Sequence, residues 1–405
     1  MPDTPRKSYT DLFRTPEFTP LFLSSSANVA AQTVSGLALG TLVFRATGSP
    51  LLSALSMFGP ALAQVLGATF LLSGADRLPP RATLAGLSLA FAAATAVLAL
   101  PGLPVGAMLA VVLVEGLIAS LGGGVRWGLL NEILTKDGYL AGRSLFNMMH
   151  GVTQIAGYAA GGVLVTVLSP RLCLLLAAGL YAAAAALTLL LTRRPPRAAG
   201  RPSAAATWRT NARLWSARPR RHVYLALWIP NGLVVGCESL YVSYDPRAAG
   251  TLFACAALGM LAGDVTVGRL LPPRLRPRLG VPLLVLLAAP YLALFLRPPL
   301  PVTAVLVALA SVGFGASLVQ QERLVVLTPD ELTGHALGLH SAGMLTAQGL
   351  AASLAGTVAQ FTSPATAMTA MALASLAVTL TLTVASRRDA GPDGGLLPRR
   401  VAQAA

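Results

Sequence analysis

The sequence predicts an all-α membrane protein with twelve transmembrane helices in two six-helix bundles. Composition is the first observation: of 405 residues, 55% are hydrophobic and only 11% are charged, whereas soluble domains carry about 25% charged residues. The second is a series of apolar runs of about 20 residues, each long enough to cross a bilayer as a helix. The third is an approximate internal repeat, which indicates two related halves.

The repeat is visible in turns at matching positions of the two halves. Arg81 ends an Arg-Leu-Pro-Pro-Arg turn, and Arg274 ends a similar Arg-Leu-Leu-Pro-Pro-Arg turn 193 positions later. The Ser-Pro pair at 169–170 returns at 363–364, 194 positions later. Two pairs with nearly the same offset favour a duplicated half-chain.

The apolar runs place six expected spans in each half. In order, they cover about 20–45, 50–73, 82–101, 104–124, 145–168 and 172–192, then 223–244, 248–268, 280–296, 300–320, 336–360 and 365–385. The expected organisation is an N-terminal bundle at 1–192, a basic cytoplasmic linker at 193–221, a C-terminal bundle at 222–389 and a disordered cytoplasmic tail at 390–405. Residues 1–20 are polar and mixed in charge, so we expect no cleavable signal peptide.

The basic residues indicate how these spans are oriented. With the N-terminus inside, 26 of the 30 basic residues fall in inner segments, which predicts that both termini are cytoplasmic. The outer loops keep only Arg45, Arg171, Arg247 and Arg297. The net charge of +15 therefore reflects membrane orientation, and no nucleic-acid partner is expected.

Arginine outnumbers lysine 28 to 2, which suggests a bacterial source and hence the bacterial cell membrane. The linker at 193–221 is expected to be a mobile loop attracted to anionic headgroups.

The sequence carries no motif of an enzyme or a metalloprotein. It has no phosphate-binding loop, nucleophile elbow or His/Cys cluster, so no enzymatic activity, cofactor or metal is expected. Cys173, Cys237 and Cys255 lie in apolar stretches without paired spacing. We interpret them as small hydrophobic residues.

The polar residues of the spans indicate which helices face a protein interior. The third, sixth, ninth and twelfth spans carry no charged residue and no histidine, which predicts that they are outer, lipid-facing helices. The other spans would surround a central cavity, because ionisable groups are costly in lipid. The candidate cavity residues are Asn28, Gln32, His150, Gln154, Tyr158, Trp228, Asn231, Tyr241, His340 and Gln348.

Some of these residues have a second interpretation. Asn28, Gln348 and the nearby Asn147 would then only tie helices together by hydrogen bonds. His150 and His340 would be structural residues near the cytoplasmic interface.

Two acidic residues lie within the expected spans. Glu115 is near mid-bilayer in the fourth span, where it is the only charge, and Glu238 is in the seventh span. Taking a carboxyl group out of water favours its neutral form, so such a group can take up and release a proton near neutral pH. Glu115 and Glu238 are therefore the candidate proton-coupling residues.

With these spans, two halves and a long central linker, the chain resembles the major facilitator superfamily. That family carries a charged turn after the second span, a latch that holds the cytoplasmic gate shut. The resemblance implies this role for Asp76, Arg77 and Arg81, and for Asp264 and Arg269 in the second half. Prolines replace the usual small residues of the first turn.

The fifth span adds a narrower resemblance. Its Gly157-Tyr158-x-x-Gly161-Gly162 segment is similar to the Gly-Pro-x-x-Gly-Gly signature of drug/proton antiporters, with tyrosine in place of proline. The resemblance implies that these three glycines pack helices closely. Residues 126–147 resemble the inner connection of macrolide-efflux-like members. Those antiporters usually carry an arginine in the fourth span, where this sequence has Glu115.

These features predict a secondary transporter that exports a hydrophobic or amphipathic small molecule, driven by proton entry, through rocking of two helix bundles. The expected partners are the substrate, protons and the lipid bilayer, and the expected state is a monomer. Two alternatives stay open. One is uptake or facilitated diffusion of a nutrient by the same fold. The other is a membrane sensor or scaffold without transport, although the linker of about 29 residues offers no periodic core for an output domain.

Overall fold

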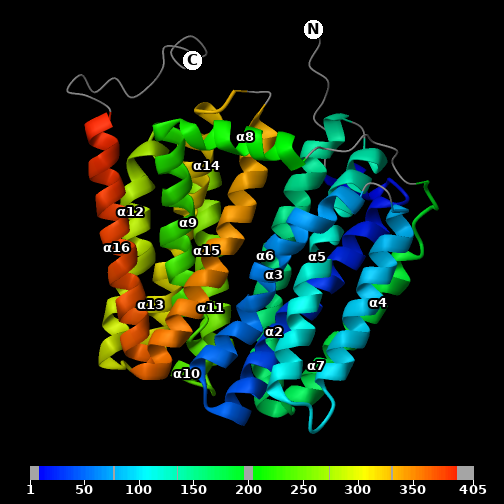
Figure 1. The fold of residues 1–405 in the computed structure, drawn as a ribbon, viewed down its shortest axis with the longest axis horizontal. Coiled ribbons are helices and arrows are strands. Elements are labelled where there is room, and N and C mark those ends of the chain that lie inside the picture. Colours follow the sequence, from blue (N-terminus) through cyan, green and yellow to red (C-terminus); the bar gives the residue numbers. More distant parts are fainter. Residues whose placement is uncertain are drawn as a thin grey trace.

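A computed structural model describes residues 9–75, 78–134, 136–195, 204–272, 274–329 and 332–389. Within these ranges the secondary structure is helical, without strands. The long helices run side by side in two groups (Figure 1). We call α1–α7 the N-terminal half and α9–α16 the C-terminal half.

The N-terminal half begins with a short helix and continues with six long ones. They are α1 (Tyr9–Phe13), α2 (Phe18–Thr47), α3 (Pro50–Ala75), α4 (Pro80–Leu98), α5 (Val105–Ile133), α6 (Lys136–Val167) and α7 (Pro170–Thr188). Proline is the first residue of α3, α4 and α7, where its missing N–H is not needed and its fixed φ suits a helix. Gly48 ends α2 with a left-handed φ of 63°, a conformation that favours glycine.

The C-terminal half has more interrupted helices. After α8 (Ala204–Ser216) in the linker, the elements are α9 (Arg218–Glu238), α10 (Tyr241–Tyr244), α11 (Ala249–Val265), the π-helical turn η1 (Thr266–Leu270), α12 (Arg276–Ala288), the 3₁₀ segment η2 (Ala289–Leu296), α13 (Leu300–Val312), the 3₁₀ turn η3 (Gly313–Gly315), α14 (Ala316–Val326), α15 (Thr333–Phe361) and α16 (Pro364–Asp389). Pro290 explains one interruption, because proline lacks the N–H that an α-helix needs at this point.

Ten helical segments among the described residues are long and apolar enough to cross a membrane. Two further helices, α6 and α15, are 32 and 29 residues long and run alongside the others (Figure 1). Both are rich in glycine and polar residues, which lowers their hydropathy. The protein is therefore an all-helical, multi-pass membrane protein.

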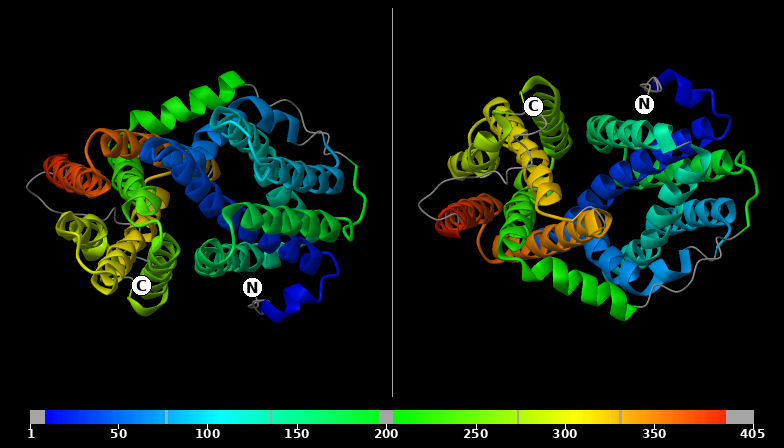
Figure 2. Two further views of the ribbon diagram at one scale, coloured as in Figure 1. Left: turned by 90° about the horizontal axis from the view of Figure 1, so that it is seen from below. Right: turned by 90° about the horizontal axis from the view of Figure 1, so that it is seen from above.

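The two halves meet along a limited set of helices. In Figure 2 the N-terminal and C-terminal helices form two separate groups when seen along the helix axes. Across the interface, α3 packs against α15 and α6 packs against α11. Within the halves, α4 packs on α7, and α16 packs on η2 and α12. The helices α4, α7, α12 and α16 take no part in the main contacts between the halves.

The halves are in closest contact at one end of the helices. We call the end that carries the four loop arginines at 45, 171, 247 and 297 the predicted outer end, and the opposite end the predicted inner end. Near the predicted outer end, a Cβ atom added to Gly162 of α6 would overlap the backbone of Gly250 in α11, and the reverse also holds. Ser49 donates a hydrogen bond of 2.6 Å from its Oγ to Oε1 of Gln360 across the same interface. The structure is thus closed at the predicted outer end.

Two connections contain helical structure that the expected spans do not include. The inner connection between the fourth and fifth spans is almost entirely helical, since α5 runs to Ile133 and α6 begins at Lys136. Leu129 and Leu130 are buried there with Phe18 and Phe146, so apolar packing maintains the helices beyond the expected ends of the spans. The linker contains α8 and is not a loop throughout, while residues 390–405 lie outside the described ranges.

Helix α8 is attached to the C-terminal half by aromatic stacking. Trp215 stacks on Trp228 with ring centroids 5.5 Å apart and an angle of 11° between the rings. Tyr224 packs against both rings, and its hydroxyl donates a hydrogen bond of 3.2 Å to the Ala336 carbonyl of α15. The linker is thereby coupled to α9 and α15.

Candidate functional site

Helices α9 and α15 bring together four of the residues predicted from the sequence. Nε2 of Gln348 donates a hydrogen bond of 2.9 Å to Oδ1 of Asn231, which is buried. Trp228 lies on the same helix as Asn231, and its ring packs so closely on Gly343 of α15 that a Cβ atom there would overlap it. His340 of α15 is also buried, and its Nδ1 has no hydrogen-bond partner among the described residues.

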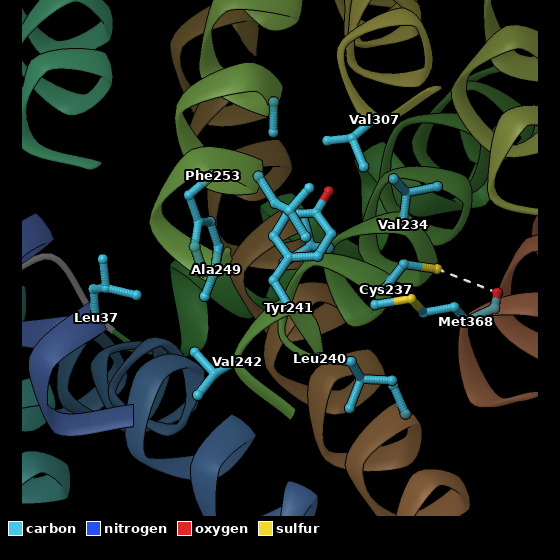
Figure 3. Packing of buried hydrophobic residues seen from close by; sticks show 14 of the residues in the cluster. Leu37, Val234, Cys237, Leu240, Tyr241, Val242, Ala249, Phe253, Val307 and Met368 are labelled. Carbon is cyan, nitrogen blue, oxygen red and sulfur yellow. Dashed lines mark hydrogen bonds between the residues drawn. The ribbon is translucent and has the colours of Figure 1, made fainter. Parts of the chain in front are cut away.

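An aromatic cluster joins the two halves near the predicted outer end. Tyr158 of α6 stacks on Phe253 of α11 with ring centroids 4.7 Å apart. Tyr241 of α10 meets the same phenylalanine edge-on at 4.9 Å, and its hydroxyl hydrogen-bonds that of Tyr291 at 2.5 Å. Figure 3 shows Tyr241 and Phe253 side by side at the centre of this packing, with Val242 next to the helices of the N-terminal half.

Glu238 is the last residue of α9 and lies beside this cluster. It is only 8% exposed, and its Oε1 has no hydrogen-bond partner in the part of the chain that the structure describes. It lies close enough to Tyr158, Tyr241 and Tyr291 to interact with each electrostatically. A buried carboxylate without a counter-charge is costly, so this environment suits the neutral acid.

Glu115 occupies a different place, inside the N-terminal half. Its carboxyl accepts a weak hydrogen bond of 3.4 Å from Oγ1 of Thr95 on α4, and it interacts with Tyr181 on α7. Tyr181 in turn interacts with Ser35 of α2. The structure thus places Glu115 among α2, α4 and α7, and Glu238 in the other half.

The remaining polar candidates of the N-terminal half are scattered. Nδ2 of Asn28 donates a hydrogen bond of 3.2 Å to Ser88, so this residue ties α2 to α4. Gln32 and His150 are exposed, on α2 and α6 respectively. Gln154 forms a hydrogen bond with Tyr158 within α6. The side chain of Asn147 lies outside the described part of the structure.

The sequence analysis missed Arg126. With an expected end at residue 124, the fourth span was assigned Glu115 as its only charge, but α5 continues past Arg126 to Ile133. Arg126 is half-buried and lies close enough to His150 of α6 to interact electrostatically. The signal that could have found it is the run of helix-compatible residues after 124. Arg126 therefore gives the N-terminal half a positive charge beside His150, at which an acidic group could bind.

The charged turns of the two halves differ. Asp76 and Arg77 lie outside the described residues, whereas Asp264 and Arg269 are exposed. Arg276, which sequence reasoning did not select, closes the second turn through an ion pair of 2.6 Å with Glu322 on α14. Its guanidinium also donates hydrogen bonds of 2.9 and 3.3 Å to the carbonyls of residues 268 and 271.

The three glycines of α6 contact two different helices. A Cβ atom on Gly157 would lie 2.9 Å from Cβ of Thr33 on α2, and one on Gly161 would make ordinary contact with α2. Gly162 faces Gly250 of α11 in the other half. The same stretch therefore packs within one half and across the interface.

Comparison with known proteins decides the family. The family model described as Major Facilitator Superfamily matches residues 21–321, about three quarters of the chain. The chain belongs to the Major Facilitator Superfamily. This superfamily chain is a membrane transporter of small molecules and not an enzyme. No curated protein matches it in sequence.

Solved structures share the superfamily fold with this chain. The nucleoside transporter NupG superimposes with a TM-score of 0.71 at 15% identity, covering 91% of this chain and 98% of that one. A POT family transporter in complex with 5-aminolevulinic acid also gives 0.71, at 11% identity, covering 92% and 96%. A bacterial homologue of the human lysosomal transporter Spinster, in an inward-facing and unoccupied conformation, gives 0.70 at 14%, covering 94% and 96%. At these identities the likeness shows the fold alone.

Proposed function

We propose that this superfamily member is a proton-coupled exporter of hydrophobic or amphipathic small molecules, with twelve spans in two six-helix halves divided near 192 and 222. The observation that carries the proposal is Glu238: a buried carboxyl group with no counter-charge among the described residues, next to the aromatic contact between the halves. A group that must be neutral when the halves close, and that can ionise when they part, links protonation to the conformational change.

The substrate class follows from the side chains along α9, α15 and the interface. Trp228 and Tyr158 offer partly exposed aromatic surface, and the Asn231–Gln348 pair offers one amide hydrogen-bonding site. Tyr241 is fully buried and would be uncovered only when the halves part. Large apolar contacts with few polar groups are typical of sites for small, mostly apolar ligands. The macrolide-efflux-like subtype and a location in the bacterial cell membrane, with cytoplasmic termini and a monomeric state, belong to the same proposal.

A second candidate is uptake of a polar nutrient. Arg126 favours it, because a guanidinium group can bind an acidic group of a substrate, with the neighbouring His150 as a further hydrogen-bonding group. The solved structures with this fold include a nucleoside transporter and a peptide transporter. Their sequence identity to this chain is low, so the similarity shows only a shared fold.

Transport by the purified protein in liposomes tests the proposal. With an imposed pH gradient, vesicles that contain the wild-type protein should move a lipophilic dye against its concentration gradient. Protons should cross the membrane at the same time, so the pH gradient should decrease. Glu238→Gln protein should insert normally but lose uphill transport. Uphill transport by both Glu238→Gln and Glu115→Gln would refute proton coupling through these groups, and accumulation of a labelled nutrient by cells carrying the protein would favour the second candidate.

A further inference from the structure

A basic cavity lies at the predicted inner end of the N-terminal half, away from the interface with the other half. It has a volume of about 380 Å³, which is within the range of small-ligand sites. Its lining residues come from the start of α4 and the chain just after α7: Pro79, Arg81, Ala82, Leu189, Arg193 and Arg194. The six lining residues include three arginines and no acidic residue.

The arginines are held in place differently. Arg194 forms an ion pair of 2.6 Å with Glu17, and Glu17 also accepts a hydrogen bond of 3.0 Å from the Thr192 backbone. These contacts fix the segment after α7 against the start of α2. Nη1 of Arg194 is nevertheless buried without a hydrogen-bond partner among the described residues. Arg81 and Arg193 form no ion pair within the described ranges.

Helix α4 contributes further positive character. It begins at Pro80, and no side chain caps its N-terminus. The first N–H groups of an uncapped helix are free to bind an anion, and the helix dipole favours negative charge at this end. The cavity therefore combines guanidinium groups with a helix terminus, a combination suited to a phosphate group.

The surroundings indicate the source of that phosphate. Helices α4 and α7 take no part in the main contacts between the halves. Next to the arginines, Leu189 and Leu190 are 55% and 66% exposed. A headgroup in the cavity would leave its acyl chains beside these leucines, on a surface that is apolar along the helix and basic at its end. Basic pockets at the cytoplasmic ends of transmembrane helices suit the headgroups of anionic lipids.

We propose that this cavity binds the phosphate of an anionic membrane phospholipid, such as phosphatidylglycerol, through Arg81, Arg193 and Arg194. Bound lipid would bridge α4 to the segment after α7 at the point where the linker begins. This site is separate from the proposed transport path and does not depend on the identity of the substrate.

Native mass spectrometry of the purified full-length protein tests the proposal. The protein is mixed with phosphatidylglycerol or with zwitterionic phosphatidylethanolamine of the same chain length, and the fraction that retains lipid is measured. We expect wild-type protein to retain phosphatidylglycerol in preference. Each arginine removed should weaken binding about fivefold, so Arg81→Gln with Arg193→Gln should weaken it about 25-fold.

A matched control comes from the equivalent turn of the second half. Arg274 and Arg278 are exposed at the same end of the molecule, and replacing both with glutamine removes the same charge. This control should retain phosphatidylglycerol like the wild type. Equal losses in both double variants would mean a general surface charge effect and would overturn the site. If the first double variant does not fold, Arg193→Gln alone decides, because Arg193 is exposed.

Inorganic phosphate separates a lipid site from a site for a soluble anion. For a lipid site, millimolar phosphate should leave phosphatidylglycerol bound. If phosphate alone raises the unfolding temperature of the wild type, fails to do so in the double variant and displaces the lipid, the ligand is a soluble anion and the lipid proposal is wrong.

Discussion

Replacing Gly162 with alanine should stop the two halves from closing at the predicted outer end. The new Cβ atom would overlap the Cα atom of Gly250, far inside the usual carbon–carbon contact distance of about 3.5–4.0 Å. Both clashing neighbours are backbone atoms, which cannot rotate away as a side chain can. Helices α6 and α11 must therefore separate by about 1 Å or more at this point.

The magnitude follows from the cost of overpacking. Inserting a methyl group into close-packed backbone costs about 1–3 kcal/mol, and a conformational equilibrium shifts by about 5- to 150-fold for that range. Because the clash exists only in the closed arrangement, this energy disfavours closure at the outer end and leaves the open arrangement unaffected. Gly162→Ala protein should consequently populate states in which the outer ends lie farther apart.

Spin-label distance measurements can check this prediction. Labels at Ala46 and Phe361, two exposed positions on opposite halves near the outer end, would be attached after the three native cysteines are replaced. The wild type should show a short distance, and Gly162→Ala should add a longer one. Gly151→Ala on the same helix, where a Cβ atom meets nothing within 4 Å, should behave like the wild type. An unchanged distance in Gly162→Ala would refute the argument that this contact closes the outer end.

Three further predictions concern local contacts. Trp215→Ala should free α8 from its stack on α9, at a cost of about 0.5–1.5 kcal/mol beyond lost burial, and should speed tryptic cleavage of the linker. The control is Trp208→Ala, at a residue that is 69% exposed. Equal cleavage of both variants would contradict the role of the stack. Partial burial raises the pKa of Glu17. Hydrogen bonds from Thr192 and the charge of Arg194 lower it by more, so the pKa lies below its ordinary value of 4.5. A lowered folded-state pKa means that the stabilisation is present above about 4.5 and is lost as the pH falls through the folded-state value; Glu17→Gln should therefore lower the unfolding temperature at neutral pH, and the gap to the wild type should close in acid, whereas a gap independent of pH would count against the ion pair. Tyr291→Phe leaves the hydroxyl group of Tyr241 buried and without its hydrogen-bond partner, which should cost about 1–3 kcal/mol of stability. An unchanged unfolding temperature would argue against this hydrogen bond.

Periodicity and charge in the sequence were sufficient for the coarse fold. Apolar runs and basic loops predict a multi-pass helical protein, since the bilayer imposes helix length and backbone pairing whatever the detailed packing. The boundaries were less accessible. The expected spans end at 124 and resume at 145, but the helices extend into this connection, where Leu129 and Leu130 bury their side chains in a cluster at the predicted inner end. Such packing depends on Phe18 and Phe146, which are distant in sequence.

The candidate site likewise contains features that the sequence predicts and features that depend on tertiary contacts. The sequence gives Asn231 and Gln348 as separate candidates on two spans, and only the fold shows that Gln348 pairs with Asn231. Spacing does not reveal that Glu115 faces α4 inside one half while Glu238 lies near the interface. Arg126 was missed because its importance depends on a helix end that tertiary contacts determine.

The most direct test of the account is the outer-end distance as a function of pH, with no substrate present. In the wild type, raising the pH should ionise Glu238, which cannot stay buried without a counter-charge, so the population with the longer distance between labels at positions 46 and 361 should grow. Glu238→Gln should stay closed at every pH. A label-to-label distance in the wild type that does not change with pH would contradict the link between this carboxyl group and the movement of the two halves. The same holds if the distance in Glu238→Gln changes with pH as in the wild type.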